Sequence, residues 1–450
     1  MIRNSMKWLK FTGIIFLLLL AVLAALPFFI SLNDYIPLIE NKLSAKIDEP
    51  VTINNIELRL LPTPHINVND VMVGVEGDLK LARVVLTPDI FSIFKSSYLI
   101  KDIEIDALVI NQKAINRLMK FTKEASSPPH AKPQFRVGRL SFTNAQLNLG
   151  KLHFGPFHAN VNLDSNGKLL EASLATVDSK FRALIKPENL NYSIVASAKN
   201  WTLPYEPRFN LDELSLLAVA TTNDIQFSKV NAKLYGGTAK GQMAINWRKG
   251  LKVNGSLDVR QVELEKIAKI LSSKTHVSGQ VTAKPVFSAS ANSIENLMQS
   301  MRLEASFDVQ KGVLYGVDIQ SAATNVIKQG TTGGQTSFEH LSGYFVMAKS
   351  SYQFSKLKIT SGTLSVEGNV NISHKKELSG RINTQVKVAG ISTIVPLNVA
   401  GTLDAPRLHP TAATMAGAAL GTAVMGPGVG TSVGAKVGGW VDDLFGKKKK

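Results

Sequence analysis

The sequence predicts a mainly β protein in which an N-terminal transmembrane helix is followed by a long, curled antiparallel β-sheet with a few short helices. Apolar and polar residues alternate in many short runs between residues 51 and 403, which is typical of strands with one apolar and one polar face. Few runs are continuously apolar, so a fully buried parallel sheet is not expected. An uncharged stretch from Phe11 to Leu32 predicts the helix.

Composition limits the classes of protein that need to be considered. The chain has 450 residues, of which 44% are hydrophobic, and this is enough for a large core. It contains no cysteine, which excludes disulfides and thiolate metal sites. The net charge is +17. Because no basic helix carries interleaved aromatics, nucleic acid is not an expected partner. The charge either keeps the protein soluble or draws the two chain ends to anionic lipid surfaces.

The first segment is a membrane anchor, residues 11–32, preceded by a tail of residues 1–10. At about 1.5 Å per residue the uncharged run is long enough to cross a hydrocarbon core of about 30 Å. Basic residues lie before it and not directly after it, which predicts a cytoplasmic N-terminus and, in a bacterium, a periplasmic chain. A cleaved signal peptide is the alternative, but its apolar region is usually about 7–15 residues long. The candidate anchor residues are Phe11, Ile14, Phe16, Leu20, Leu23, Leu26, Phe29 and Leu32.

Residues 33–124 are predicted to form one helix, several strands and a second helical stretch. In the segment after the anchor an apolar residue recurs every fourth position, at Tyr35, Ile39, Leu43 and Ile47, which predicts a short amphipathic helix. Strands are expected over 51–60, 65–75, 79–87 and 98–110, and helical spacing over 112–124. Residues 125–133 contain three prolines and form the clearest linker.

The rest of the chain divides into three predicted segments. Residues 134–260 contain only strands and turns, and are called the central β repeats. Residues 261–410 contain strands interrupted by short helices, expected over 262–274, 292–301 and 316–329. Residues 411–450 form a tail that is rich in glycine and alanine and ends in four lysines.

Several of the predicted strands change phase in the middle. In "LSFTNAQLNL" (140–149), Leu140 and Phe142 alternate with polar residues, but after Thr143-Asn144 the apolar positions move by one. The runs beginning at residues 51 and 66 show the same slip. A pair of Asn or Asp residues is a turn or bulge signal that reverses or bends the chain. Repeated, it predicts a curling meander, whose apolar face either closes into a packed core or stays open as a trough.

The tail carries small residues at helical spacing. Gly417 and Gly421 are four apart, as are Gly430, Gly434 and Gly438, and this spacing lets helices approach closely. Each of these two glycine-spaced stretches is too short to span a bilayer as a helix. We therefore weigh a helical hairpin that lies on a membrane or docks on a partner against a flexible tail. The candidate contact residues are Gly430, Gly434, Gly438, Trp440 and Phe445.

No pattern of catalytic, cofactor-binding or metal-binding residues is found. The eight histidines are scattered, and the one close pair, His153 and His158, has no neighbouring carboxylate. The glycine-rich run in the tail lacks the Gly-Lys-Ser/Thr ending of a phosphate-binding loop. No serine lies in a nucleophile elbow. We therefore expect a protein that is not an enzyme.

Three stretches of the chain have patterns that are shared with a known family. Residues 33–74 have the order helix, strand, proline break and strand. Residues 264–319 contain "KGVLYGVDI", which is similar to a Gly-x-hydrophobic-x-Gly-hydrophobic-Asp run, and residues 336–410 continue the same strand-rich region. In this order the three stretches resemble the N-terminal part, the C-terminal core and the end of that core in the AsmA family, inner-membrane-anchored periplasmic proteins of Gram-negative bacteria.

The resemblance implies a repeating β-groove, like that of bridge-like lipid-transfer proteins, and so favours the open trough. It implies phospholipid transport between inner and outer membranes and an intact outer envelope, with phospholipid acyl chains and the inner membrane as partners. A periplasmic or outer-membrane protein is a further partner expected at the tail. The alternative is an assembly or scaffold factor for outer-membrane proteins, which would bind polypeptide at strand edges. Candidate groove residues are Val51, Ile53, Phe142, Leu357 and Ile359.

Overall fold

The computed structural model describes residues 32–90, 92, 98–115, 135–150, 152–205, 208–270, 272–292, 294–324, 333–362, 364–388, 391–425 and 429–445. The predicted anchor and linker lie outside these residues, apart from Leu32. No helix in the described part of the chain is both long and apolar enough to cross a membrane. The chain divides into two compact units. Unit 1 comprises Met1–Ala198 and Leu203–Arg208, and unit 2 comprises Lys199–Thr202 and Phe209–Lys450.

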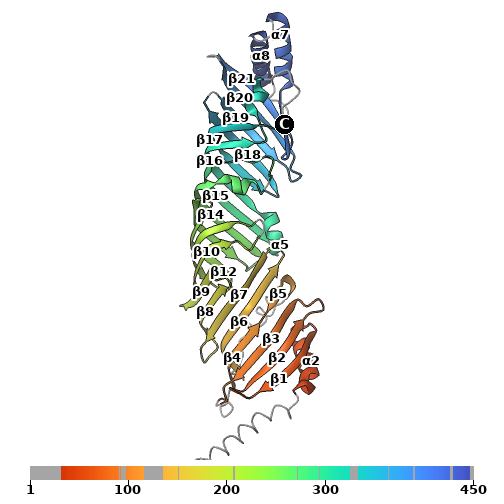
Figure 1. Cartoon of the computed structure of the whole chain (residues 1–450), viewed down its shortest axis with the longest axis vertical. Helices are drawn as coiled ribbons and strands as arrows, with labels where there is room; N and C mark the ends of the chain where they lie inside the picture. Colours follow the sequence, from red (N-terminus) through yellow and green to blue (C-terminus); the bar gives the residue numbers. More distant parts are fainter. Residues whose placement is uncertain are drawn as a thin grey trace, which may run out of the picture. The chain divides into compact units, whose positions relative to one another are not determined.

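Unit 1 consists of short helices followed by strands (Figure 1). Its helices are η1 (Asn33–Tyr35) and α2 (Ile36–Ile47). Its strands are β1 (Val51–Arg59), β2 (His65–Val73), β3 (Leu79–Pro88), β4 (Tyr98–Asp106), β5 (Val109–Asn111), β6 (Phe135–Leu149), β7 (Leu152–Leu163), β8 (Leu169–Thr176), β9 (Phe181–Glu188) and β10 (Asn191–Thr202), the last of which enters unit 2 after Ala198.

Strand pairing in unit 1 is antiparallel except around β6. Consecutive strands pair antiparallel from β1 to β4 and from β6 to β10. β6 instead runs parallel to both β4 and β5, and β5 pairs antiparallel with β3. The predicted strand 98–110 is thus two strands, which are separated at Ala107, a residue with a φ of 52°. The mainly β class is confirmed, with one parallel connection that alternation alone does not reveal.

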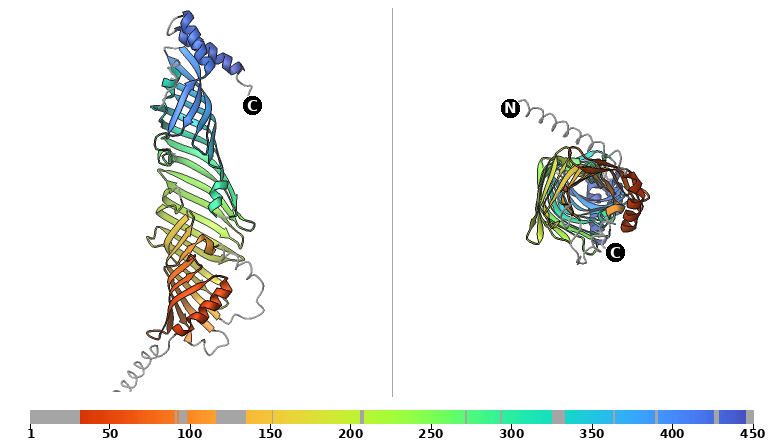
Figure 2. Two further views of the ribbon diagram at one scale, coloured as in Figure 1. Left: turned by 90° about the vertical axis from the view of Figure 1, so that its right-hand side faces the viewer. Right: turned by 90° about the horizontal axis from the view of Figure 1, so that it is seen from below.

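Unit 2 is a meander of twelve strands with short helices and a C-terminal helical hairpin (Figures 1 and 2). Its strands are β11 (Asn210–Ala220), β12 (Asp224–Leu234), β13 (Gly237–Asn246), β14 (Leu251–Glu263), β15 (Gln280–Ala291), β16 (Arg302–Tyr315), β17 (Gln335–Ala348), β18 (Ser351–Ser361), β19 (Leu364–Ile372), β20 (Leu378–Val388), β21 (Ile391–Thr402) and β22 (Ala405–Pro410). Its helices are α4 (Leu264–Ala268), α5 (Ile294–Leu297), η3 (Met298–Ser300), α6 (Ile319–Thr324), α7 (Ala412–Met425) and α8 (Val429–Phe445).

Every strand of unit 2 pairs antiparallel with the next one, from β11 to β22. Helices exist in all three stretches where the sequence predicted them between these strands. α4 occupies five residues of the expected 262–274, because Val262 and Glu263 still belong to β14. α5 and η3 lie within 292–301, and α6 is described as far as Thr324. The rest of the stretch predicted over 316–329 lies outside the described residues.

The phase slips are irregularities within strands and not reversals of the chain. At Thr143-Asn144, β6 carries one extra residue opposite β7, and Asn144 has a φ of 54°. This bulge shifts the alternation so that Phe142 and Ala145 lie in the same apolar cluster. The prediction that the slip marks a bulge is confirmed. The alternative prediction, that the chain reverses there, is wrong. The slip keeps the two halves of a strand on one face of the sheet.

The slips in β1 and β2 work differently, because both strands change phase together. Asn54 stands between the pairs Ile53–Val71 and Asn55–Asn69, opposite Asp70, whose φ is 51°. The Asn54 side-chain amide donates to the Asp70 carboxylate (3.2 Å). The apolar residues before and after the slip belong to one cluster.

In unit 2 bulged strands lie beside regular ones. β12, β14 and β18 each carry an extra residue relative to a neighbour, whereas β13 and β15 alternate without interruption. Two of the bulges place a residue in the left-handed region, Gln261 (φ 54°) and Lys356 (φ 51°). A bulge increases the local right-handed twist, so the repeated bulges curl the sheet while its apolar residues stay on one face.

Helix α2 covers the outer edge of β1. Three backbone N–H groups of β1 donate to side chains of η1 and α2: Val51 to Ser44 Oγ (2.9 Å), Ile53 to Glu40 Oε1 (2.7 Å) and Ile56 to Asn33 Oδ1 (2.8 Å). The edge of a sheet usually leaves such donors unpaired, which invites another strand. Here that edge is occupied by the helix.

The helix that the sequence predicted from its four-residue stripe exists, but only Ile39 and Ile47 of that stripe pack on the sheet. Tyr35 is 57% exposed and Leu43 is 37% exposed. The residues that contact β1 and β2 are Ile36, Ile39 and Ile47. The correction follows from the helix lying along a strand edge, where Glu40 and Ser44 must also point toward the sheet.

Candidate functional site

The sheet of unit 2 has one apolar face. Cross-strand pairs on this face are apolar on both sides, as in Phe227–Met243, Ile245–Val253 and Val259–Ala283. Farther along the meander the same face carries Leu303–Met347, Ala305–Phe345, Phe345–Phe354, Phe354–Val370 and Val366–Ile359. We call the surface formed by these residues the apolar face.

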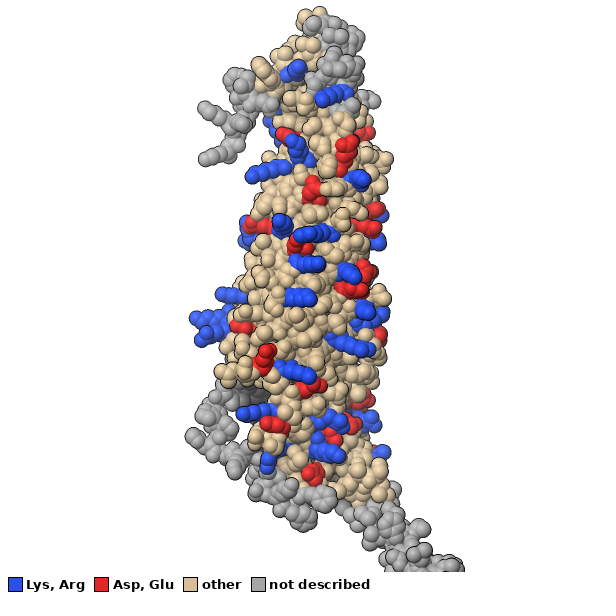
Figure 3. Space-filling model, turned by 90° about the vertical axis from the view of Figure 1, so that its left-hand side faces the viewer, with Lys and Arg blue, Asp and Glu red and all other residues tan. Residues whose placement is uncertain are grey.

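The opposite face carries polar and charged pairs. Glu213 and Lys233 are cross-strand partners with an ion pair of 2.8 Å, and Lys358 and Glu367 form another of 3.4 Å. In Figure 3 basic and acidic side chains are interspersed over the face in view. Exposed pairs of this kind each contribute only about 0.2–1 kcal/mol. Their main consequence is that this face is hydrated, which leaves the other face as the apolar surface.

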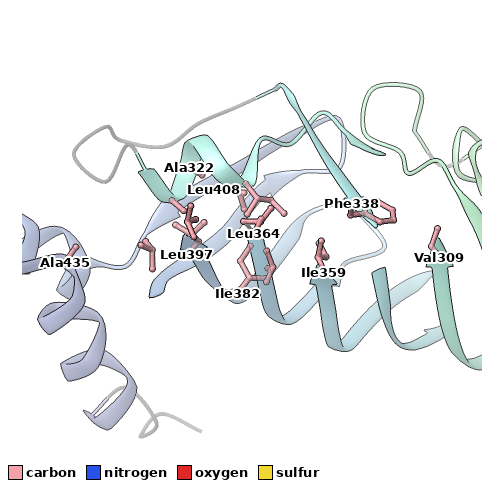
Figure 4. Close-up of a cluster of buried hydrophobic side chains, with 14 of the residues drawn as sticks. Val309, Ala322, Phe338, Ile359, Leu364, Ile382, Leu397, Leu408 and Ala435 are labelled. Carbon is pink, nitrogen blue, oxygen red and sulfur yellow. The ribbon is translucent and has the colours of Figure 1, made fainter. Parts of the chain in front are cut away.

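Part of the apolar face is closed by α6. Side chains of β16–β22 and of the helix form one buried cluster (Figure 4). Leu397 is 0% exposed and Val309 is 1% exposed. The start of the helix is fixed because the Ile319 N–H donates to Thr336 Oγ1 (3.0 Å), while that hydroxyl donates to the Val317 carbonyl (2.8 Å). In this part the packed core, and not an open trough, is what the structure shows.

The other ends of the same strands carry an aromatic group that is only partly buried. It comprises Phe307, Phe345, Tyr352 and Phe354, which we call the aromatic region. The ring centroids of Phe345 and Phe354 are 5.0 Å apart, and those of Phe307 and Phe354 are 6.3 Å apart in an edge-to-face arrangement. Phe345 and Tyr352 stack at 6.1 Å. These rings are among the residues of the apolar face that are partly exposed and therefore accessible to an apolar ligand.

Two aromatic rings lie against glycines of the neighbouring strand. A Cβ built on Gly343 would be 3.1 Å from Cζ of Phe307, and one on Gly255 would be 2.5 Å from Cζ of Phe287. Each ring therefore occupies the space that a side chain would take on the facing strand. A flat ring over a glycine covers the backbone while projecting less than two opposed side chains would.

Unit 1 has two apolar clusters of its own. One, beneath α2, includes two predicted groove residues, Val51 (4% exposed) and Ile53 (8% exposed). The other includes the predicted residue Phe142, which is partly buried beside Ala145 and Phe157. Val51 and Ile53 thus lie on an apolar face, but they contact the helix. Among the three, Phe142 is the one that retains partial exposure.

The two predicted groove residues of unit 2 lie on the apolar face in different surroundings. Leu357 is partly exposed and follows the bulge at Lys356, whereas Ile359 is 6% exposed within the closed cluster. Sequence analysis missed the aromatic region altogether. The available signal was the alternation of Leu303, Ala305 and Phe307 with polar residues, but its pairing with β17 and β18 is a long-range property.

The predicted tail contacts are used within the tail. α7 and α8 pack as a hairpin in which a Cβ on Gly434 would collide with the Gly417 carbonyl oxygen, and one on Gly438 with that of Ala413. Trp440 is 74% exposed. The side chains of Gly430 and Phe445 lie outside the described residues. Contact of these residues with a membrane or partner stays a prediction.

Among the described residues no group of three or more His, Asp or Glu side chains could hold a metal ion. The Tyr344 hydroxyl donates to Glu304 (2.6 Å) and, with Arg302, lowers the pKa of that carboxyl. The Arg260 guanidinium likewise lowers the pKa of Asp258. Both carboxyls lie on the polar face, where they take part in pairing between neighbouring side chains.

Fold and site together define a class: a β-sheet protein with bulged, curled strands, one apolar face and one hydrated face. The model of the AsmA family matches residues 5–207, and the family resemblance is thereby confirmed for this part of the chain. The resemblance of residues 264–319 and 336–410 lies beyond that match and stays a prediction. No significant match was found among curated proteins or among solved structures.

Proposed function

We propose that the protein is a lipid-binding protein of the periplasm, anchored in the inner membrane by residues 11–32, that takes up phospholipid acyl chains along its apolar face. In this role it supports phospholipid transport between inner and outer membranes and the integrity of the outer envelope. The single observation that carries the proposal is the aromatic region, which is apolar, partly exposed and flanked by a polar opposite face. The AsmA-family match over residues 5–207 supports it.

The energetic reason is the cost of exposing hydrocarbon to water. Each methylene removed from water contributes about 0.8 kcal/mol, so an acyl chain gains in proportion to the length that it lays on an apolar surface. The sheet offers its backbone groups in paired form, which means that the ligand desolvates few polar groups. Aromatic rings over glycines provide a smooth surface for a flexible chain. We propose binding and not catalysis as the activity.

The alternative role, an assembly factor that binds polypeptide at strand edges, finds less support. The free edge of β1 is occupied by side chains of η1 and α2. The last strand, β22, is only six residues long and contains Pro406 and Pro410, which lack a backbone donor. Neither edge offers the row of unpaired groups that strand addition requires.

Photo-crosslinking in cells tests the proposal along β18. A photoreactive residue placed at 352, 354 or 357 should label lipid, because these positions lie on the accessible part of the apolar face. Positions 353, 355 and 358 lie on the polar face and serve as matched controls. Because of the bulge at Lys356, labelling should skip from 354 to 357 and not continue at 356.

Position 359 provides an internal control, since Ile359 lies in the cluster closed by α6. It should label far less than 357. Lipid labelling with equal strength on both faces, or at 359 as strongly as at 357, would contradict an acyl-chain site at this place. Labelling of a polypeptide in place of lipid would support the assembly role.

A further inference from the structure

The C-terminal hairpin has its small residues inside and its large apolar residues outside. On α7, Leu420 is 69% exposed and Val424 is 82% exposed. On α8, Val437 is 59% exposed and Trp440 is 74% exposed. Helices of a soluble protein normally turn such residues inward and expose their alanines. The hairpin has the opposite arrangement, so we expect an apolar partner to cover its outer surface.

The inner contact explains how the reversal is stable. Gly417 and Gly434 approach so closely that neither position has space for a Cβ, while Ala418 is 0% exposed and Ala435 is 2% exposed. The hairpin is also fixed to the sheet, because Gly439 lies against the fully buried Pro396 of β21. The exposed side chains therefore belong to an element that is already packed. They are not core side chains left exposed because the fold is incomplete.

The exposed residues follow helical spacing. On α8, Val433, Val437, Trp440 and Val441 occur at i, i+4, i+7 and i+8, and all four are exposed. They form a single stripe along the helix. With Leu420 and Val424 they define what we call the hairpin surface. Lys436 is the one charged residue between Ala412 and Val441, and it is exposed.

We propose that the hairpin surface docks on an anionic lipid bilayer and lies in its interfacial layer. α7 has 14 residues and α8 has 17, which correspond to about 21 and 26 Å, short of the roughly 30 Å of a hydrocarbon core. Such helices lie in the interface with the apolar side chains buried about 5–10 Å deep. This inference does not depend on lipid binding by the apolar face.

Charge and side-chain type favour a bilayer over a protein as the occupant. Lys447–Lys450 follow α8 directly and outnumber Asp442 and Asp443, so the end of the hairpin carries the charge that anionic headgroups attract. Tryptophan is the residue preferred at headgroup depth, and Trp440 lies on the exposed stripe. Apart from the indole N–H of Trp440, the stripe offers no side-chain group with which a protein partner could form hydrogen bonds that fix its orientation.

The test uses Trp440 as a probe in the full chain. Replacing the other three tryptophans, Trp8, Trp201 and Trp247, by Phe leaves a single fluorophore. The chain is reconstituted in vesicles of phosphatidylcholine and mixed with acceptor vesicles of phosphatidylglycerol that carries bromine on its acyl chains. If the hairpin surface enters the acceptor bilayer, the fluorescence should fall by about twofold, as expected for an indole at interfacial depth.

Two exposed substitutions measure the contribution of the apolar side chains. Leu420→Ser and Val424→Ser should each lower the affinity for acceptor vesicles by about tenfold. Leu190→Ser, at a turn residue that is 97% exposed in unit 1, is the matched control and should change nothing. Because all three residues are exposed, the variants should fold, and circular dichroism verifies this. High salt should weaken docking by screening the lysines.

Each outcome decides the proposal. Quenching by brominated phosphatidylglycerol in the acceptor vesicles supports it. In a second experiment the host phosphatidylcholine carries the bromine, and quenching only there would overturn the proposal that the hairpin surface docks on an anionic bilayer. A blue-shifted emission without bromine quenching shows that a protein surface or a second copy covers Trp440 and overturns it. Unchanged emission in both experiments overturns it as well. Lipid labelling along β18 tests lipid binding by the apolar face independently of this experiment.

Discussion

Deleting Lys356 should remove the bulge of β18 and leave the second half of the strand on the same face of the sheet. Lys356 is the extra residue of the bulge, with a φ of 51°, and its N–H donates to Asn369 Oδ1 (3.0 Å). Before the bulge the apolar face is reached by Phe354, and after it by Leu357 and Ile359. Without the extra residue these three side chains would alternate strictly with Ser355 and Lys358, so they would all stay on the apolar face.

The expected magnitude follows from what the deletion removes. The bond from the Lys356 N–H to Asn369 Oδ1 is lost, which costs about 0.5–1.5 kcal/mol. Ile359, which is 6% exposed, and Leu357, which is partly buried against Gly368 and Gly343, keep their places on the apolar face. Turning both side chains into water would instead lower the free energy of unfolding by about 3–5 kcal/mol. That is a large part of the about 5–15 kcal/mol that stabilises a domain, so the two cases are easily distinguished.

Urea unfolding, followed by tryptophan fluorescence of the full chain in detergent, measures the change. The matched control is Lys356→Gly, which keeps the bulge and suits its left-handed backbone, and should be neutral or stabilising by up to about 1 kcal/mol. The deletion variant should keep lipid labelling at the residue that was 357. If the deletion lowers the free energy of unfolding by about 3 kcal/mol or more, or moves the labelling to the residue that was 358, Lys356 is not a single extra residue in an otherwise alternating strand, and our account of the apolar face is wrong.

Three further changes test other parts of the structure. Glu40→Ala should destabilise unit 1 by about 1–3 kcal/mol in thermal or urea unfolding, because the Ile53 N–H loses its acceptor at 2.7 Å. Gly434→Leu should separate α7 from α8, which accelerated proteolysis of the tail would reveal, while unchanged cleavage would contradict the close contact. Tyr344→Phe should lower stability only at a pH above the ordinary pKa of Glu304, and the difference should vanish as pH falls through the lowered folded-state pKa of that carboxyl. A constant difference across that range would show that the hydroxyl acts otherwise.

Alternation in the sequence was sufficient to predict most strands and the positions at which the alternation changes phase. The slip at Thr143-Asn144 marked a real bulge, and its position was correct to the residue. Its meaning was not available locally, because whether a slip turns a strand over or restores its phase depends on the pairing with β7. That pairing is set by residues such as Phe157 and Ala159, which are more than ten positions away.

The candidate site was predictable as a surface but not in its detail. Val51 and Ile53 do lie on an apolar face, yet α2 covers them, because Asn33, Glu40 and Ser44 serve as acceptors for β1. Those three side chains look like ordinary helix residues in the sequence. Partial exposure of the aromatic region depends on where α6 lies on the sheet, which is again a tertiary property.

The alternation of regular and bulged strands over β12–β15 gives this part of the sheet a way to change length without changing its chemistry. β13 and β15 alternate strictly, and the bulged strands β12 and β14 beside them regain the same phase after one extra residue. A regular strand with a bulged one therefore forms a self-consistent pair, which widens the sheet by about 10 Å at roughly 4.8 Å per strand. Adding such a pair extends the apolar face and keeps every older residue on its own side. Adding a strand whose alternation does not match its neighbours would put charge into that face, so selection on the face acts first on the bulges.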